Sequence, residues 1–229
     1  MSAESPQPFS GEDGLGGTNT AAKADILARI RAAVDGADQV DLPAAPSDPL
    51  SAVSASAALA TFRDRIEDYR ATIEQVSTAE LAGAVANACR SHGVTNLLIS
   101  AGVPADWCAG LDAAGVEQVA DSDDLSATDL DQLSGVLSAA AVAVAETGTI
   151  VLDGGPGQGR RIASLVPDVH ICVVRADQLV AGVPAAVARL TGTNPLTWIS
   201  GGSATSDIEL NRVEGVHGPR TLHVLVTED

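Results

Sequence analysis

The stretch that decides the fold covers residues 140–174 and reads AAVAVAETGTIVLDGGPGQGRRIASLVPDVHICVV. It opens with small apolar residues, and a second apolar segment follows at 149–152. A glycine-rich loop and a short helical segment then lead to a third apolar run at 169–174. Short apolar runs bounded by glycine and polar residues are typical of buried strands in a parallel sheet. The stretch therefore predicts buried strands joined through a loop and a helical turn.

The same alternation continues on both sides of this stretch. Apolar runs at 94–99, 196–200 and 221–227 predict further strands, with helical spacing between them. Residues 58–76 carry apolar side chains at intervals of three and four, which predicts the clearest helix of the chain. Strands that alternate with helices indicate an α/β domain with a mostly parallel sheet flanked by helices.

The first quarter of the chain has a different composition. Residues 1–19 are rich in Ser, Pro, Gly and acid, so we expect a disordered tail. Residues 20–57 combine a helix at 20–35 with a proline-rich linker, which together form an N-terminal helical extension. The folded domain is expected at 58–229.

Composition excludes several classes of function. The 229 residues include 30 acidic and 13 basic side chains, a net charge of −17, which disfavours binding to nucleic acid or to an anionic membrane. No run approaches the ~20 apolar residues of a membrane span, and no secretory signal is visible. Three cysteines without CxxC spacing, and four scattered histidines, predict no metal or iron–sulfur cofactor in this chain. We expect a cytoplasmic protein.

The glycine loop at 153–161 is the first candidate site. Glycines let a backbone approach a ligand closely, and free N–H groups at the start of a helix attract anions. The loop matches neither a Walker A motif nor GxGxxG. It is either a site for a small anion or carboxylate, or a tight turn whose arginines pair with local acids; we favour the anion site. Its candidate ligand-binding residues are Gly155, Gly157, Gln158, Gly159, Arg160 and Arg161.

A second candidate is the turn Glu146-Thr147-Gly148, directly after the small apolar run. A carboxylate there is costly unless it is paired or exposed in a cleft, and ligands of open α/β sheets bind at the carboxyl ends of strands. Glu146 is therefore a candidate nucleophile or general base, with Thr147 and Gly148 as ligand-binding neighbours. An ordinary turn acid paired with an arginine explains the spacing equally well.

The third candidate is the polar stretch at 199–220, which lies between two predicted strands. We favour a binding loop over a helix cap with internally paired charges, because connecting loops on a rigid scaffold often carry binding groups. His170 and His223 lie within strands and are expected to be satisfied core or surface histidines. The candidate ligand-binding residues of the polar stretch are Ser203, Thr205, Ser206, Asp207, Glu209, Arg212, His217 and Arg220.

These motifs together resemble the LUD-domain family, and within it the lactate utilization C, or YkgG, subgroup. The similar segments are residues 146–149, 155–161, 167–171 and 203–220, and the helix at 24–31 also resembles that subgroup. The resemblance begins near residue 20 and is densest from Ala140 onward. It implies a fold like those of ribose-5-phosphate isomerase, glucosamine-6-phosphate deaminase (NagB) and coenzyme A transferases.

The resemblance also implies a role in oxidising L-lactate to pyruvate, together with the iron–sulfur lactate utilization proteins A and B, which carry the clusters. On this view the chain is an accessory subunit that binds a small carboxylate, since the planar fork of arginine can hold a carboxylate bidentately. The arginines proposed for this are Arg160, Arg161, Arg212 and Arg220.

Two alternatives remain. The first is an independent acyl or coenzyme A transferase with Glu146 as nucleophile. In coenzyme A transferases the catalytic Glu stands in a Glu-Asn-Gly turn, whereas here Thr147 replaces the Asn. The second is a structural scaffold whose polar loops satisfy one another. The residues leave open whether the chain is itself an enzyme. Both the accessory-subunit hypothesis and the transferase hypothesis expect the glutamate turn, the glycine loop and the late polar stretch to meet at one pocket.

Overall fold

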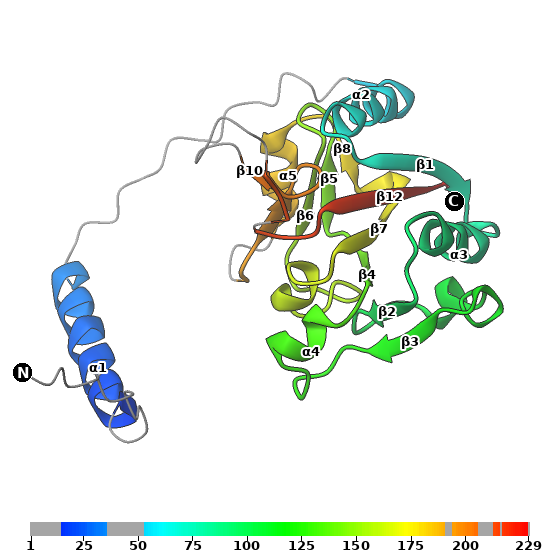
Figure 1. Ribbon diagram of the computed structural model, residues 1–229. Helices are drawn as coiled ribbons and strands as arrows, with labels where there is room; N and C mark the ends of the chain where they lie inside the picture. Colours follow the sequence, from blue (N-terminus) through cyan, green and yellow to red (C-terminus); the bar gives the residue numbers. More distant parts are fainter. Residues whose placement is uncertain (1–14, 36–52, 191–193, 206–212, 216, 229) are drawn as a thin grey trace, which may run out of the picture. The chain divides into compact units, whose positions relative to one another are not determined.

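The computed structural model describes residues 15–35, 53–190, 194–205, 213–215 and 217–228 (Figure 1). The chain divides into two units, Met1–Ala44 and Ala45–Asp229. The described part of the first unit is the helix α1 (Leu15–Val34), which begins before the expected start at residue 20. The rest of the predicted tail and most of the predicted linker, at 1–14 and 36–52, lie outside the described residues.

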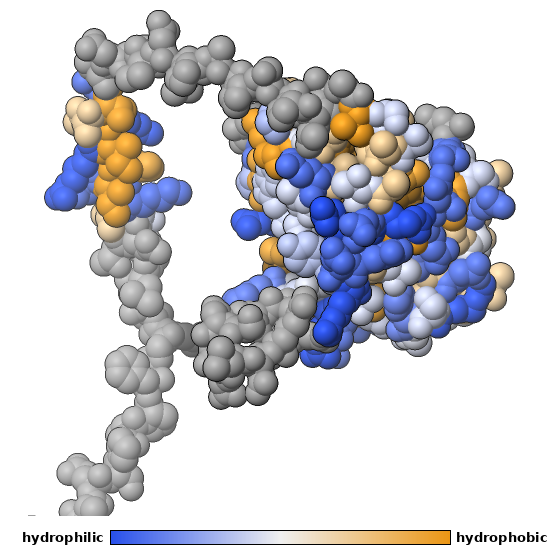
Figure 2. Space-filling model, turned by 90° about the horizontal axis from the view of Figure 1, so that it is seen from above, coloured by the Kyte–Doolittle hydropathy of each residue, from blue (hydrophilic) through white to orange (hydrophobic). Residues whose placement is uncertain are grey.

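Figure 2 shows hydrophobic colour along one side of helix α1. A stripe with this spacing is typical of a helix that packs on another surface. The exposed apolar side chains on α1 are Ile26, Leu27, Ile30 and Val34.

The second unit is built on a six-stranded sheet in the order β1-β12-β7-β4-β2-β3, in which all neighbouring strands are parallel (Figure 1). The predicted α/β fold with a mostly parallel sheet is confirmed. Because the strands are parallel, their carboxyl ends share one edge, where ligands of such sheets usually bind. The strands are β1 (Thr72–Ser77), β2 (Asn96–Ile99), β3 (Glu117–Ala120), β4 (Gly135–Ala139), β7 (Val169–Arg175) and β12 (Thr221–Glu228).

A smaller sheet packs on one face of the main sheet. Its order is β8-β5-β6-β9, with β5 and β6 forming an antiparallel hairpin. Ile150 and Leu152 of the hairpin share a buried cluster with Cys172 and Val224 of the main sheet. The strands are β5 (Val142–Val144), β6 (Thr149–Leu152), β8 (Leu179–Val180) and β9 (Thr197–Ile199); β10 (Ala204–Thr205) and β11 (Val213–Glu214) form a separate ribbon.

Helices complete the layers. Val85 of α3 packs with Leu137, Ile171 and Leu225 on the other face of the main sheet. None of the described helices is both long and apolar enough to cross a membrane. The α-helices are α2 (Ala55–Asp68), α3 (Leu81–Ser91), α4 (Ala127–Asp131) and α5 (Val183–Arg189), and the 3₁₀ turns are η1 (Ala105–Cys108), η2 (Asp112–Ala114), η3 (Arg161–Ser164) and η4 (Ala176–Gln178).

The prediction of a long helix at 58–76 is wrong in its second half. Helix α2 ends at Asp68, and Arg70 adopts a left-handed backbone conformation with φ of 61°. This conformation is uncommon for a residue with a Cβ and breaks the helix. The following residues pair with β12 in register, with Ile73 opposite Val224. Pairing in the sheet therefore determines their conformation, although their apolar side chains have helical spacing. Helix α4 is short for a similar reason: it ends at Asp131, and β4 takes residues 135–139 into the sheet.

Candidate functional site

The glycine loop lies across the carboxyl ends of two central strands. The backbone N–H of Ala139, the last residue of β4, donates to the carbonyl of Gly157 over 2.7 Å. The N–H of Gly157 in turn donates to the carbonyl of Ala101, just beyond β2, over 3.0 Å. The loop therefore lies at the edge of the sheet where the fold most often places ligands.

Two positions in the loop favour glycine through both backbone conformation and close packing. Gly157 and Gly159 have φ of 79° and 67°, in the left-handed region that disfavours other residues. A Cβ on Gly157 would lie 2.9 Å from the Cβ of Ala139, and one on Gly159 would lie 2.8 Å from the Oγ of Ser100. Close approach to the main sheet, as well as backbone conformation, therefore explains these glycines.

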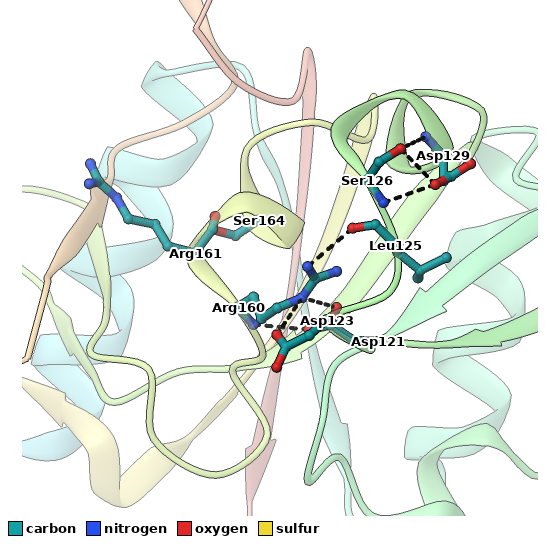
Figure 3. Close-up of polar contacts among 8 residues, drawn as sticks. All are labelled: Asp121, Asp123, Leu125, Ser126, Asp129, Arg160, Arg161 and Ser164. Carbon is teal, nitrogen blue, oxygen red and sulfur yellow. Dashed lines mark hydrogen bonds and ion pairs between the residues drawn. The ribbon is translucent and has the colours of Figure 1, made fainter. Parts of the chain in front are cut away.

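Arg160 fixes the loop to the end of β3 (Figure 3). Its Nε donates to Oδ1 of Asp121 over 2.8 Å, and its backbone N–H donates to Oδ2 of the same carboxylate over 2.9 Å. Its Nη1 donates to the carbonyl of Leu125 over 3.2 Å. The Asp121 side chain is only 1% exposed, so this is a largely desolvated pair. Arg160 thus has the geometry of a structural arginine paired with a local acid.

Arg161 points away from this pair, as Figure 3 shows. Its side chain makes no hydrogen bond or ion pair with any residue that the structure describes, and it lines a cavity of about 210 Å³. Gln158, at the same cavity, braces the loop: its Oε1 accepts the N–H groups of Asp153 and Gly154. The lining residues are Leu152, Gly154, Gln158, Gly159, Arg160, Arg161, Ser164, Pro195 and Thr197.

The late polar stretch forms a second cavity, of about 250 Å³. Ser203 is central to its wall, since its N–H donates to the carbonyl of Pro219 over 2.7 Å and its Oγ accepts the N–H of His217 over 3.1 Å. Ser164 and Thr197 line both cavities, so the two are adjacent. The lining residues are Ser164, Leu165, His170, Thr197, Trp198, Ile199, Ser200, Gly201, Gly202, Ser203, His217, Gly218, Pro219 and Leu222.

His170 lines this second cavity, whereas its place within a strand predicts a satisfied core or surface histidine. It is buried, and its Nε2 lies 2.7 Å from the Oγ of Ser138. Its Nδ1 has no hydrogen-bond partner among the described residues. Burial lowers the pKa of His170 to about 4, so the ring is neutral at neutral pH. The only sequence signal was a polar residue inside an otherwise apolar strand.

Glu146 lies at a different place. It is exposed in the turn between β5 and β6 and lines a cavity of about 180 Å³ that includes Arg65 of α2. Thr147 Oγ1 lies 2.7 Å from Thr149 Oγ1, which lies 2.7 Å from the Oγ of Ser200. Hydroxyl groups therefore connect the turn to the late stretch, but Glu146 and the glycine loop line separate cavities.

The remaining predicted residues are distributed as follows. Gly148 packs tightly against α2, since a Cβ there would lie 2.7 Å from the Cβ of Arg65. Arg220 forms an exposed ion pair with Asp168, 3.4 Å between Nη1 and Oδ2, and lines neither of the two adjacent cavities. Gly155 lies in the glycine loop and Thr205 in β10. The residues outside the described part of the chain are Ser206, Asp207, Glu209 and Arg212.

Metal-binding and thiol chemistry have little support in the described ranges. There, no group of three or more His, Cys, Asp or Glu side chains is arranged to hold a metal ion. Burial raises the pKa of the Cys89 thiol to about 11 and that of Cys172 to about 12. Both thiols are protonated at neutral pH, which makes them poor nucleophiles and poor metal ligands.

Comparison with known proteins agrees with this architecture. The chain is 47% identical over 209 residues to lactate utilization protein C of Deinococcus radiodurans, covering 90% of this chain and 95% of that protein. It is 37% identical over 95 residues to lactate utilization protein C of Shouchella clausii, covering 38% of this chain and 41% of that protein. The crystal structure of a DUF162 family protein from D. radiodurans matches with a TM-score of 0.64 and 44% identity, covering 76% and 99% of the two chains. Residues 59–227 match the LUD domain model, and the chain therefore belongs to the LUD-domain family.

Proposed function

We propose that this chain acts in lactate utilization as a carboxylate-binding accessory subunit of a system that oxidises L-lactate to pyruvate. The name of the D. radiodurans relative supports the role in lactate utilization. On this proposal the iron–sulfur clusters belong to partner proteins, lactate utilization proteins A and B, and this chain contributes a binding site in the cytoplasm.

The observation that carries the proposal is the charge of the two adjacent cavities. The whole chain has a net charge of −17, which repels carboxylates in general. Among the residues that the structure describes, no Asp or Glu lines either cavity, while Arg161 lines one of them without a described partner. A cavity whose described lining includes arginine and no acid, on so acidic a protein, is suited to a small anion.

The two neighbouring arginines have separate roles in this proposal. Arg160 is held by Asp121 and positions the loop, whereas Arg161 offers its guanidinium to the ligand. A planar guanidinium can donate two parallel hydrogen bonds to a carboxylate. The site binds and orients a ligand, and no covalent step is required of this chain.

Acyl transfer through Glu146 has less support from the geometry. Its cavity also contains Arg65, which is engaged with Asp64 and Asp68 at 3.2 and 3.6 Å. The glycine loop, which would have to hold a phosphate or thioester oxygen, lines other cavities. Borohydride trapping with acyl-coenzyme A, followed by mass mapping of Glu146, tests this alternative directly.

The experiment that tests carboxylate binding is calorimetric titration of the purified chain with L-lactate, pyruvate and uncharged lactamide. We expect both acids to bind and lactamide not to bind. Arg161→Ala should weaken binding of the acids about tenfold, in line with loss of a charge-assisted hydrogen bond. Arg189→Ala is the matched control, because Arg189 is also exposed but lies on α5 and bonds the carbonyl of Asp177. Equal affinities for the acids in both variants would refute the assignment to Arg161.

The lactate role is tested in cells. A strain that lacks this chain should lose growth on L-lactate and regain it with the intact gene, while Arg161→Ala should restore growth only in part. Co-purification from lactate-grown cells should bring down iron–sulfur proteins. A deletion strain that grows normally on L-lactate would remove the role altogether.

A further inference from the structure

The second cavity differs in chemistry from the one that holds Arg161. Its described lining contains no Asp, Glu, Lys or Arg side chain, and it includes the apolar groups of Leu165, Trp198, Ile199 and Leu222. An uncharged, partly apolar cavity favours an uncharged, partly apolar occupant, because burying a charge without a partner is costly. The carboxylate of a ligand therefore belongs beside Arg161, and the second cavity suits another part of a molecule.

The position of the two cavities allows one ligand to occupy both. Ser164 and Thr197 form a common wall between them. Each cavity alone, at about 210 and 250 Å³, is smaller than a typical small-molecule site of roughly 300–1,000 Å³, but the two together fall within that range. A three-carbon acid bound at Arg161 would leave the apolar cavity unused.

His170 is the polar side chain of the second cavity that has an unpartnered ring nitrogen among the described residues. Buried side-chain nitrogens nearly always have a hydrogen-bond partner, yet its Nδ1 has none among the described residues. Ser138 can donate to Nε2 or accept from it, so Nδ1 can be either a donor or an acceptor. A hydroxyl group satisfies a ring nitrogen in both tautomers, since it donates and accepts.

We propose that the two cavities form one site for a hydroxycarboxylate of more than three carbons, with its carboxylate at Arg161 and its uncharged body in the cavity that contains His170 and Trp198. This inference rests on the proposed carboxylate-binding function and defines the class of ligand. Lactate itself is then a weak, incomplete ligand of the site.

Trp198 makes the proposal measurable. It is 43% exposed and lines the second cavity, whereas the chain's other tryptophan, Trp107, packs with the α3 cluster on the other face of the main sheet. The variant Trp107→Phe leaves Trp198 as the only indole. Ligands that enter the second cavity should change its fluorescence, and the reciprocal variant Trp198→Phe should give no change.

The decisive experiment titrates the full chain with 2-hydroxy acids of three to six carbons. Burial of each added methylene should tighten binding by about two- to fourfold until the cavity is filled. Trp198→Ala, at a half-exposed position, should reduce this gain with chain length. Arg161→Ala should weaken every member of the series by a similar factor.

The hydroxyl requirement is tested with six-carbon acids. Either 2-hydroxyhexanoate or 6-hydroxyhexanoate should bind about five- to tenfold more tightly than hexanoate, the gain of a buried hydrogen bond. His170→Gln should remove that preference. Equal binding of all three acids would overturn the role of His170; if His170→Gln fails to fold, the comparison in the intact chain still decides.

The outcomes separate this inference from the function on which it rests. Affinities that do not change with chain length, together with weakening by Arg161→Ala, would overturn the two-cavity ligand and leave the carboxylate-binding subunit in place. Absence of binding for every acid in the series would refute both. Binding that tightens with chain length and is sensitive to Trp198→Ala supports the inference even where lactate binds too weakly to measure.

Discussion

The glycine loop and the glutamate turn lie at opposite ends of the same short strand, β6, and they differ in how the rest of the fold contacts them. Segments from three other parts of the fold hold the loop, through Ala101, Asp121 and Ala139. The turn instead presents Glu146 to solvent beside α2. Both segments are polar and glycine-containing, so local composition does not separate them. What separates them is which end of β6 meets the carboxyl edge of the main sheet.

The largest effect should come from breaking the attachment of the loop. Asp121→Ala leaves Arg160 without its carboxylate in a largely desolvated place and should lower the free energy of unfolding by about 3 kcal/mol. Asp123→Ala is the control, since Asp123 is 99% exposed and lies 3.9 Å from the same Nε. Urea denaturation of both variants measures the difference. Similar stabilities would show that the loop does not depend on this pair.

Acidification should give the next largest effect, through the second cavity. Burial lowers the pKa of His170 from 6.5 to about 4, so the unfolded chain binds more protons between these values. Stability from this residue is complete above pH 6.5 and decreases as the pH falls toward 4, by up to about 3 kcal/mol.

His170→Gln should flatten that part of the stability–pH curve, measured by urea denaturation at several pH values. Burial also lowers the pKa values of His92 and His223, so these residues contribute a slope of the same sign that should remain in the variant. A variant curve parallel to that of the parent would contradict the assignment to His170.

A smaller effect should distinguish two glycines within the loop. Gly159→Ala combines a left-handed backbone with a Cβ 2.8 Å from Ser100 Oγ and should cost about 2 kcal/mol. Gly154→Ala has a similar φ of 72° but nothing within 4 Å of the new Cβ, so it should cost only about 1 kcal/mol. Thermal unfolding of the two variants gives the order. The reverse order would mean that close packing on the main sheet is unimportant.

The smallest effect is expected at the other end of β6. Glu146→Gln should change stability by less than about 0.5 kcal/mol, as is usual for an exposed side chain. It should also leave carboxylate affinity unchanged, in contrast to Arg161→Ala, because Glu146 lines a separate cavity. A marked loss of affinity in calorimetry would restore the idea of one pocket shared by both ends of the strand.

The sequence predicted strands best where they are apolar throughout. Buried runs such as 149–152 and 169–174 became β6 and β7 because burial on both faces needs no alternation of polar residues. The edge strands β1 and β3 were missed, since their partly exposed residues resemble helix or loop. Ile73 fits a helical spacing and a strand equally well, and only its pairing opposite Val224 decides between them.

The candidate site was predictable in part, where its features follow from residues close together in the sequence. Glycines that need a left-handed backbone and arginines that follow them are visible in the sequence, so the loop was found. The different roles of Arg160 and Arg161 were not visible, because Asp121 is 39 residues away along the chain. The sequence also gave no sign that the Nδ1 of His170 lacks a hydrogen-bond partner among the described residues, because this depends on how the buried ring packs beside distant parts of the chain.

The sequence by itself determined the α/β class, the buried strands and the positions of the polar loops, because apolar periodicity and backbone preferences act over a few residues. Only the tertiary structure decided which loops meet. It set Arg160 against a buried acid, left Arg161 at a cavity with no acid among its described lining residues, and put Glu146 at another cavity. These outcomes depend on strand order and sheet packing, which bring distant residues within the few ångströms over which hydrogen bonds and ion pairs act.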